Sequence, residues 1–306
     1  MNTHKTLVTL LQLILVISPI TLFAASYNVP AGSNSLVGGL QYYNVQSGDS
    51  IAKIAQHYDV GYNGLEQANP DYNVANVSAG TTLKIPTYHL LPNQGRQGLV
   101  INLPEMRMYY YPAGSAEVYT YPIGIGKIGR TIPVTLTSVT RKAENPTWVP
   151  PDSIREFNLE QGIVLPQVMP PGPDNPLGPY AIYMRVPTYL IHSTIFPESI
   201  GKRASFGCIR MFEKDIENFF PSITRGVPVA IINAPTKVGL NNNHLYLEVH
   251  PALEEHSGAY DASLPGIVSK ISHNYKNIPM LVDWQAVSYI AQERDGIPHN
   301  VGVRLQ

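Results

Sequence analysis

Cysteine is almost absent from this chain, and charge is scarce. One cysteine in 306 residues excludes an intramolecular disulfide and a thiolate metal cluster. Charged residues make up 14% of the chain, below the ~25% that is typical, and the formal net charge is −1. That balance removes the electrostatic basis for binding nucleic acid, which requires a surplus of cationic side chains. The lone thiol is either a buried filler or a nucleophile.

Long hydrophobic runs are absent after the N-terminal segment. Residues 6–23 are mostly apolar, follow a short positively charged start and precede small residues at positions 24–26 that suit a signal peptidase. A membrane anchor is the alternative, and Pro19 with scattered polar residues argues against it. We interpret residues 1–26 as an export signal. In the oxidising setting outside the cytoplasm an unpaired cysteine is a liability unless it is buried or has a chemical role. Export therefore favours a chemical role for Cys208.

The residues that are abundant favour strands and ordered loops. Hydrophobic residues reach 44%, and the chain has 19 tyrosines, 27 prolines and 24 glycines. This hydrophobic content excludes a disordered protein, and many prolines and tyrosines suit β-structure better than a helical bundle. The length allows two or three domains of ~100–200 residues each.

Residues 42–86 predict a strand, two short helices and a second strand. Tyr43 and Val45 alternate as in a strand, and Ser50 is placed to cap a helix with apolar residues at helical spacing. A second helix should end before Asn69-Pro70, after which residues 82–86 return as a strand.

This pattern, which opens with Val-Gln-Ser-Gly-Asp-Ser, resembles a LysM domain. That family binds N-acetylglucosamine-containing glycans such as peptidoglycan in a shallow groove. By the resemblance, Asp49, Ser50, Asn69 and Pro70 would line this groove. A small structural module without a ligand is the alternative, because a fold alone does not confer binding.

Residues 97–234 are rich in strand signals. The runs 99–103 and 107–111 flank Pro104-Glu105, which predicts a hairpin, and residues 118–139 hold two further extended runs. Between those two runs, residues 124–129 match G-x-G-x-x-G. A dinucleotide fingerprint must open a helix, whereas a β-branched run follows here, so we expect a hairpin loop and no nucleotide site.

A proline-rich stretch follows at residues 170–179. Its composition suits a linker, and its length and rigidity equally suit an ordered loop beside a site. The sequence alone does not choose between the two.

A candidate base and a candidate nucleophile lie sixteen residues apart, at His192 and Cys208. A cysteine nucleophile needs a neighbouring base, and its developing oxyanion needs backbone N–H donors, which the turn at Gly207-Cys208 supplies. This combination indicates acyl transfer. A buried structural cysteine and a satisfied core histidine are the alternative.

The complete strings Ile191-His192-Ser193 and Ser205-Phe206-Gly207-Cys208-Ile209-Arg210-Met211 resemble the signature of the L,D-transpeptidase (YkuD-type) family. The resemblance continues upstream through residues 105–112, 122–126, 146–148 and 171–178. It implies a mainly β protein whose catalytic domain is a β-sandwich at residues 97–234, preceded by the LysM domain at 42–86. The arrangement is similar to periplasmic enzymes of Gram-negative bacteria that act on peptidoglycan.

The resemblance also assigns roles residue by residue. Cys208 matches the acylated nucleophile, His192 the base that activates it, and Ser193 the residue whose carbonyl orients the histidine. Ser205 and Gly207 match positions that shape the oxyanion pocket.

Two further positions carry open questions. Arg210 matches a variable position that contacts substrate, and a structural arginine that holds the loop is an equal alternative. Phe206 departs from the family, which usually has a second histidine there. His192 is then the only imidazole in the motif, and we expect Phe206 to be a packing residue.

The implied reaction has two half-steps. Cys208 attacks the carbonyl of diaminopimelate, the third residue of a tetrapeptide stem, and expels D-alanine. The thioester then passes its acyl group to an amine, either another diaminopimelate in a 3→3 crosslink or the terminal lysine of an outer-membrane lipoprotein. Carbapenem-type β-lactams would inhibit it. No metal or organic cofactor is needed, and no clustered His, Asp and Glu spacing suggests one.

Residues 235–306 are less informative. Residues 245–249 alternate as a strand, and Trp284, Val287 and Ile290 predict an amphipathic helix over 283–294 that packs into a core. No role follows for this segment.

Two rival functions remain. A LysM-bearing cysteine peptidase of the NlpC/P60 type would carry its cysteine before its histidine, and here the order is reversed. A non-catalytic peptidoglycan-binding protein is the other rival, with Phe206 marking a dead site.

Overall fold

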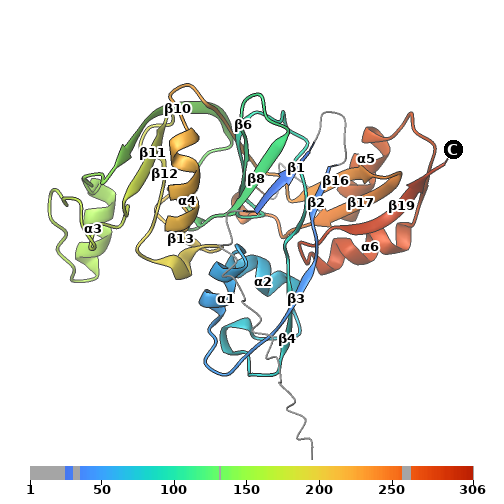
Figure 1. The fold of residues 1–306 in the computed structure, drawn as a ribbon, viewed down its shortest axis with the longest axis horizontal. Helices are drawn as coiled ribbons and strands as arrows, with labels where there is room; N and C mark the ends of the chain where they lie inside the picture. Colours follow the sequence, from blue (N-terminus) through green and yellow to red (C-terminus); the bar gives the residue numbers. More distant parts are fainter. Residues whose placement is uncertain (1–24, 30–34, 131, 257–262, 306) are drawn as a thin grey trace, which may run out of the picture.

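The computed structural model describes residues 25–29, 35–130, 132–256 and 263–305, and shows three units in contact (Figure 1). The LysM segment lies below the central sheets in this view, and the C-terminal unit lies on the side opposite α3 (Asp152–Glu160). Most of the expected export signal lies outside the described residues, but Ala25 and Ser26 belong to strand β1 (Ala25–Asn28). No helix among the described residues has the length and hydropathy needed to cross a membrane.

The central unit is a mainly β sandwich, as expected. Among the described residues, nine of its strands follow the order β1–β8–β7–β6–β15–β10–β11–β12–β14. Beyond β1 their bounds are β6 Gly98–Asn102, β7 Arg107–Tyr111, β8 Glu117–Pro122, β10 Thr135–Glu144, β11 Tyr180–Met184, β12 Leu190–His192, β14 Ile209–Arg210 and β15 Pro228–Ile232. The long strand β10 pairs with β15 near its start and with β11 near its end, with a register shift between Val139 and Arg141. This strand therefore joins the two sheets.

Alternating apolar side chains fill the space between the sheets. The β6–β7 hairpin turns at Pro104-Glu105 as predicted, with Met106 in the left-handed region at φ +52°. The helix α4 (Glu213–Phe219) follows the catalytic turn and buries Ile216 and Phe219 against this core. A short 3-10 helix, η3 (Phe220–Ser222), continues it.

The glycine-rich stretch at residues 124–129 is not the hairpin loop that we expected. The strands before and after it, β8 and β10, are separated in the sheet by β7, β6 and β15, so the stretch crosses the end of the sandwich. Within it β9 (Ile125–Gly126) pairs in parallel with β13 (Arg203–Ser205). The stretch therefore lies against the segment that leads to Cys208, and no helix follows it.

The LysM unit has the predicted strand–helix–helix–strand order. Its strands β3 (Gln41–Asn44) and β4 (Thr82–Ile85) pair antiparallel, and its helices are α1 (Ile51–His57) and α2 (Tyr62–Ala68), followed by η1 (Val74–Asn76). Ser50 caps α1 by accepting a hydrogen bond from the N–H of Lys53, as predicted. The unit packs on the central unit through backbone hydrogen bonds from Tyr62 and Asn63 to residues 200–201, beside η2 (Pro197–Ser199).

The C-terminal unit is a small α+β domain with its own core. Its sheet has the order β16–β17–β19–β18, with two helices packed on it; the bounds are β16 Thr236–Asn241, β17 His244–Val249, β18 Met280–Val282, β19 His299–Arg304, η4 Glu254–His256, α5 Leu264–Asn274 and α6 Trp284–Glu293. The predicted helix is α6, and Val287 and Ile290 are buried as expected. Trp284 is 45% exposed, so the prediction that it packs into the core with Val287 and Ile290 was wrong. It is the first residue of α6.

Residues 145–179 form a segment, called the lid here, between β10 and β11. The proline-rich stretch within it is an ordered loop and not a linker. Asn175 is buried and its side-chain amide donates to the carbonyl of Pro146 at 2.8 Å, while Trp148 and Met169 exchange two backbone hydrogen bonds. The linker between the LysM and central units is ordered too, with β2 (Leu36–Gly38) paired to β5 (Tyr88–Leu90).

Candidate active site

Cys208 lies on a tight turn between β13 and β14. The hydroxyl of Ser205 organises this turn, because it donates to the carbonyl of Cys208 at 2.6 Å and accepts from the N–H of Gly207 at 3.0 Å. Gly207 has φ +116°, and a Cβ there would lie 2.5 Å from the Tyr189 ring, so only glycine fits. The turn is shaped as expected, but the N–H of Gly207 is already used. The N–H of Cys208, without a partner among the described residues, is left as the oxyanion donor.

His192 is brought to this turn by a parallel strand pair. It ends β12, whose partner β14 begins directly after Cys208, with His192 opposite Arg210. Its Nδ1–H donates to the carbonyl of Ser193, which fixes the tautomer and leaves Nε2 free to accept a proton. The hydroxyl of Ser193 donates to the carbonyl of Leu177 at 2.9 Å and accepts from the N–H of Tyr180 at 3.0 Å. Ser193 therefore holds the histidine in place.

The resting pair is neutral. Burial and the charge of Arg210 lower the pKa of His192 to about 4, against the opposing effect of its hydrogen bonds to backbone carbonyls. Burial also raises the pKa of the Cys208 thiol, although a backbone hydrogen bond and Arg210 oppose it. At neutral pH the site therefore holds a neutral thiol and an unprotonated imidazole, and an unprotonated imidazole is the form that a general base requires.

Two cavities meet at Cys208. One, of about 570 Å³, is lined by Arg130 and Arg141 and is called the arginine cavity here. The other, of about 280 Å³, is lined by His192, with Asp174 and Arg210, and is called the histidine cavity. Both are roofed by residues of the lid, Trp148, Ile154 and Leu177. A thiol reached from two sides suits a reaction that joins two separate chains.

Arg210 holds the catalytic turn through its backbone, and its side chain lines the histidine cavity. Its backbone exchanges two hydrogen bonds with Gly124, at 2.8 and 2.9 Å, which ties the catalytic turn to the glycine-rich stretch. Its guanidinium reaches the histidine cavity, where it lies 5.6 Å from the Phe196 ring.

Phe206 makes the contacts of a packing residue. Its ring meets the ring of Phe157 on α3 edge to face at 5.0 Å, and the ammonium of Lys127 lies 4.0 Å from the Phe206 ring and 3.7 Å from the Phe157 ring. These contacts attach the lid to the catalytic turn.

Comparison with known proteins agrees with this geometry. The L,D-transpeptidase catalytic domain (YkuD) matches residues 96–231, and the LysM domain matches residues 43–86. The protein named "Probable L,D-transpeptidase YcfS" from Escherichia coli (strain K12) is 39% identical over 284 residues, which cover 91% of this chain and 88% of that protein. The chain belongs to the L,D-transpeptidase family.

A second curated relative supports this assignment. "Probable L,D-transpeptidase ErfK/SrfK" from Salmonella typhimurium is 36% identical, with 91% of each chain covered. Among solved structures, the catalytic domain of an E. faecium L,D-transpeptidase is 21% identical with a TM-score of 0.34, covering 46% of this chain and 100% of that one.

The LysM unit of this L,D-transpeptidase places the four expected groove residues differently. Pro70 and Ser50 are exposed, and Asp49 is partly exposed while it accepts hydrogen bonds from Tyr43 and from the N–H of Gln46. Asn69 is 3% exposed, and its side-chain amide is used by the backbone of Leu65 and Lys84. Its hydrogen bonds hold α2 to β4, so its side chain is occupied within the fold.

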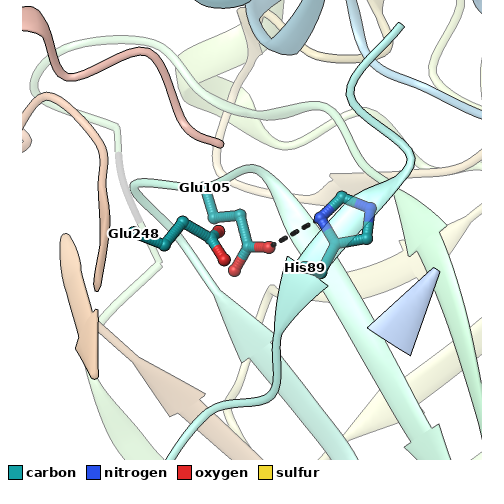
Figure 2. Close-up of side chains that lie close together, drawn as sticks. All are labelled: His89, Glu105 and Glu248. Atoms are coloured by element: carbon teal, nitrogen blue, oxygen red, sulfur yellow. Dashed lines mark ion pairs between the residues drawn. The ribbon is translucent and has the colours of Figure 1, made fainter. Parts of the chain in front are cut away.

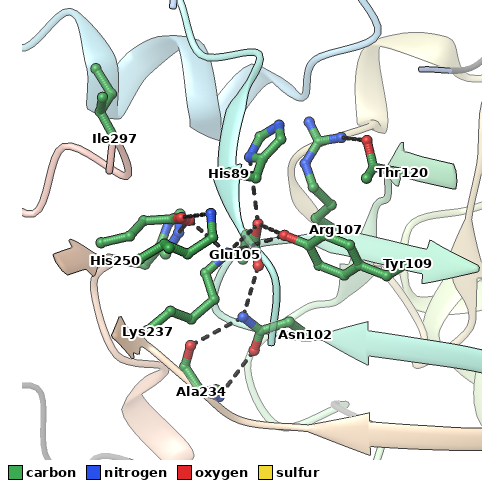
Figure 3. Close-up of polar contacts among 12 residues, drawn as sticks. His89, Asn102, Glu105, Arg107, Tyr109, Thr120, Ala234, Lys237, His250 and Ile297 are labelled. Atoms are coloured by element: carbon green, nitrogen blue, oxygen red, sulfur yellow. Dashed lines mark hydrogen bonds and ion pairs between the residues drawn. The ribbon is translucent and has the colours of Figure 1, made fainter. Parts of the chain in front are cut away.

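Sequence reasoning missed a buried polar cluster where the units meet (Figure 3). Lys237 lies between Glu105 and Glu248, with its Nζ 2.8 Å and 2.7 Å from one oxygen of each. Tyr109 donates to Glu105, and His250 contacts the carboxylate of Glu248 at 2.7 Å. The members lie far apart in the sequence and in no local pattern, so no signal could have found them.

Part of this cluster resembles a metal site. His89, Glu105 and Glu248 place three potential ligand atoms within 4.8 Å of one another (Figure 2). The ammonium of Lys237 is already ion-paired with both carboxylates, however. Burial lowers the pKa of His89, and Arg107 and Lys237 are close enough to lower it further, so positive charge already surrounds these three side chains. A divalent ion would have to displace Lys237 and lie beside Arg107. The residues therefore do not fit a metal site.

Proposed function

We propose that this L,D-transpeptidase forms a thioester between Cys208 and the diaminopimelate carbonyl of a peptidoglycan tetrapeptide stem. The observation that supports this most is the placement of thiol and base. Cys208 directly precedes β14 and His192 ends the neighbouring strand β12, and both line the histidine cavity. A buried structural cysteine would not line two cavities, one of which it shares with an unprotonated imidazole.

The first half-step follows from the neutral pair. Nε2 of His192 takes the thiol proton as the sulfur attacks the carbonyl carbon, and the N–H of Cys208 stabilises the oxyanion. The carbon–nitrogen bond to D-alanine then breaks, and His192 gives the proton to the departing amine. Ser193 keeps the imidazole oriented through both transfers.

The second half-step repeats the first in reverse with a new amine. The neutral amine enters the histidine cavity and attacks the thioester carbonyl. Its proton passes to Nε2 of His192, and His192 returns this proton to the departing sulfur, which restores the thiol. Another diaminopimelate and the terminal lysine of a lipoprotein both supply such an amine.

The LysM unit would hold the enzyme on its polymeric substrate. We place the protein in the periplasm and assign glycan binding to the surface around Asp49, Ser50 and Pro70. Binding there raises the local concentration of stem peptides at Cys208 without adding to the chemistry. Pro70→Glu in the full-length protein should lower the fraction that sediments with isolated sacculi, with turnover of soluble muropeptides unchanged. Equal sedimentation of both proteins would contradict this assignment.

The acyl-enzyme itself is the test of the proposed chemistry. Full-length protein is mixed with a disaccharide-tetrapeptide, quenched in acid and weighed intact by mass spectrometry. The wild type should gain the mass of the donor less D-alanine, and Cys208→Ala should gain nothing. An adduct on Cys208→Ala, or D-alanine release without any adduct or transfer product, would contradict the proposal.

A further inference from the structure

The two cavities at Cys208 differ in charge. Arg130 and Arg141 line the arginine cavity, which has no acidic residue among its described lining residues. Neither arginine has an ion-pair partner in the described part of the chain. Arg141 stacks its guanidinium on the ring of Tyr183 at 3.3 Å, a contact that leaves the edge of the guanidinium free to donate hydrogen bonds.

Both arginines are held at fixed places relative to the thiol. Arg141 lies on β10 directly opposite Tyr183 in the β10–β11 pair. The carbonyl of Arg130 would lie 2.1 Å from a Cβ on Gly126 and 3.0 Å from a Cβ on Gly207, so its backbone packs against the catalytic turn itself. The backbones of both arginines are therefore fixed beside the thiol, and their side chains, which are exposed, line the arginine cavity.

The position of the base decides which part of the substrate lies in each cavity. His192 lines the histidine cavity and not the arginine cavity. The departing D-alanine amine and the incoming amine both exchange a proton with His192, so both must lie on its side of the carbonyl. The acyl part of the donor stem must then extend from Cys208 toward the other cavity, whose volume of about 570 Å³ lies in the range of small-ligand pockets.

The acyl part carries a free carboxylate. Diaminopimelate is a dicarboxylic acid, and only one of its two carboxyl groups becomes the thioester. We propose that Arg130 and Arg141 bind the free carboxylate of the donor stem and thereby set donor specificity. This subsite rests on the proposed function, which supplies the donor. A planar guanidinium can donate two parallel hydrogen bonds to a carboxylate, and two such groups suit one anion in a partly enclosed cavity.

The test combines substitutions with a substrate that lacks the charge. Full-length wild type, Arg130→Met and Arg141→Met are compared with two disaccharide-tetrapeptides, one with the free carboxylate and one with that carboxylate amidated. Arg225→Met serves as the matched control, because Arg225 is exposed and lies outside both cavities. Steady-state kinetics give KM and kcat, and the rate of iodoacetamide labelling of Cys208 reports whether the thiol is intact.

We expect each cavity substitution to lower kcat/KM for the carboxylate donor by about tenfold, mainly through KM, as for a charge-assisted hydrogen bond near solvent. The wild type should lose a similar factor with the amidated donor, and the substitutions should add little to that loss. Labelling by iodoacetamide, and every value for Arg225→Met, should match the wild type.

The possible failures are distinguishable. Suppose that the wild type is active. If both cavity variants then lose the same factor with the two donors, or keep full activity with both, the inference is overturned and the proposed function stands. If the wild type transfers neither donor, both the proposed function and the inference are contradicted.

Discussion

Lys237 offers the most quantitative prediction, because its ammonium forms ion pairs with two buried carboxylates at once. Its side chain is 2% exposed, and those of Glu105 and Glu248 are 2% and 0% exposed. Lys237→Met keeps the length of the side chain but leaves two carboxylates without their shared cation. Removing one partner of a buried ion pair costs about 3–5 kcal/mol.

The lowered pKa of Glu105 reflects the same interaction together with those of its other neighbours. Burial alone would raise this pKa, but Lys237, His250 and hydrogen bonds outweigh burial and lower it from 4.5 to about 2. At ~1.36 kcal/mol for each pH unit, that difference corresponds to about 3 kcal/mol of stability, in agreement with the mutational range. Because the folded pKa is the lower one, this stability is present above pH 4.5 and is lost as the pH falls through about 2.

The assay is thermal unfolding of the full-length protein. A loss of about 3–5 kcal/mol should lower Tm by at least about 6 °C, at about 2–4 °C for each kcal/mol in domains of 150–250 residues. Lys276→Met is the matched control, since Lys276 is exposed, and it should change Tm by less than about 1 °C because surface substitutions have small effects. The gap between wild type and Lys237→Met should narrow between pH 5 and pH 2. A Tm equal to that of the control, or a gap independent of pH, would refute the reasoning.

Three further predictions concern the thiol. A penem- or carbapenem-type β-lactam should add one covalent mass to the wild type and none to Cys208→Ala, and His192→Ala should label about 10²–10⁴-fold more slowly because a general base is lost; equal labelling of wild type and Cys208→Ala in intact-mass spectra would sink the assignment. Phe206→His should change the second-order labelling rate much less than His192→Ala does, because Phe206 packs against the lid; a large gain over a nearly inert wild type would favour a degenerate binder. Since the pKa of His192 is lowered to about 4, the labelling rate should stay nearly constant from pH 8 to pH 5 and fall below about pH 4 as the imidazole becomes protonated; a fall centred on pH 6.5 would contradict the lowered pKa.

Local patterns in the sequence predicted the elements that depend on neighbouring residues. The cap at Ser50, the hairpin at Pro104-Glu105 and the spacing of Val287 and Ile290 each reflect a local rule, and the structure has all of them. The motif around Cys208 likewise predicted that Cys208 and His192 lie at one site, because the family signature spans a short stretch of chain. Their roles as nucleophile and base stay predictions.

Features that depend on distant contacts could not be predicted in this way. The stretch at residues 124–129 crosses the sandwich because three strands from elsewhere in the chain separate β8 from β10. Lys237 meets Glu105 only when the C-terminal unit packs on the central one. Asn69 belongs to a LysM-like string, yet its amide is occupied by the backbone of its own unit. In each case a tertiary contact decides what a residue does.

The fate of the stem peptide tests the central claim most directly. Mature wild-type protein and Cys208→Ala are incubated with disaccharide-tetrapeptide, and the products are separated and weighed. We predict a crosslinked dimer together with released D-alanine from the wild type, and unchanged substrate with Cys208→Ala. Smaller peptide fragments would indicate a peptidase, and unchanged substrate with the wild type would indicate a binding protein; either result would contradict the account.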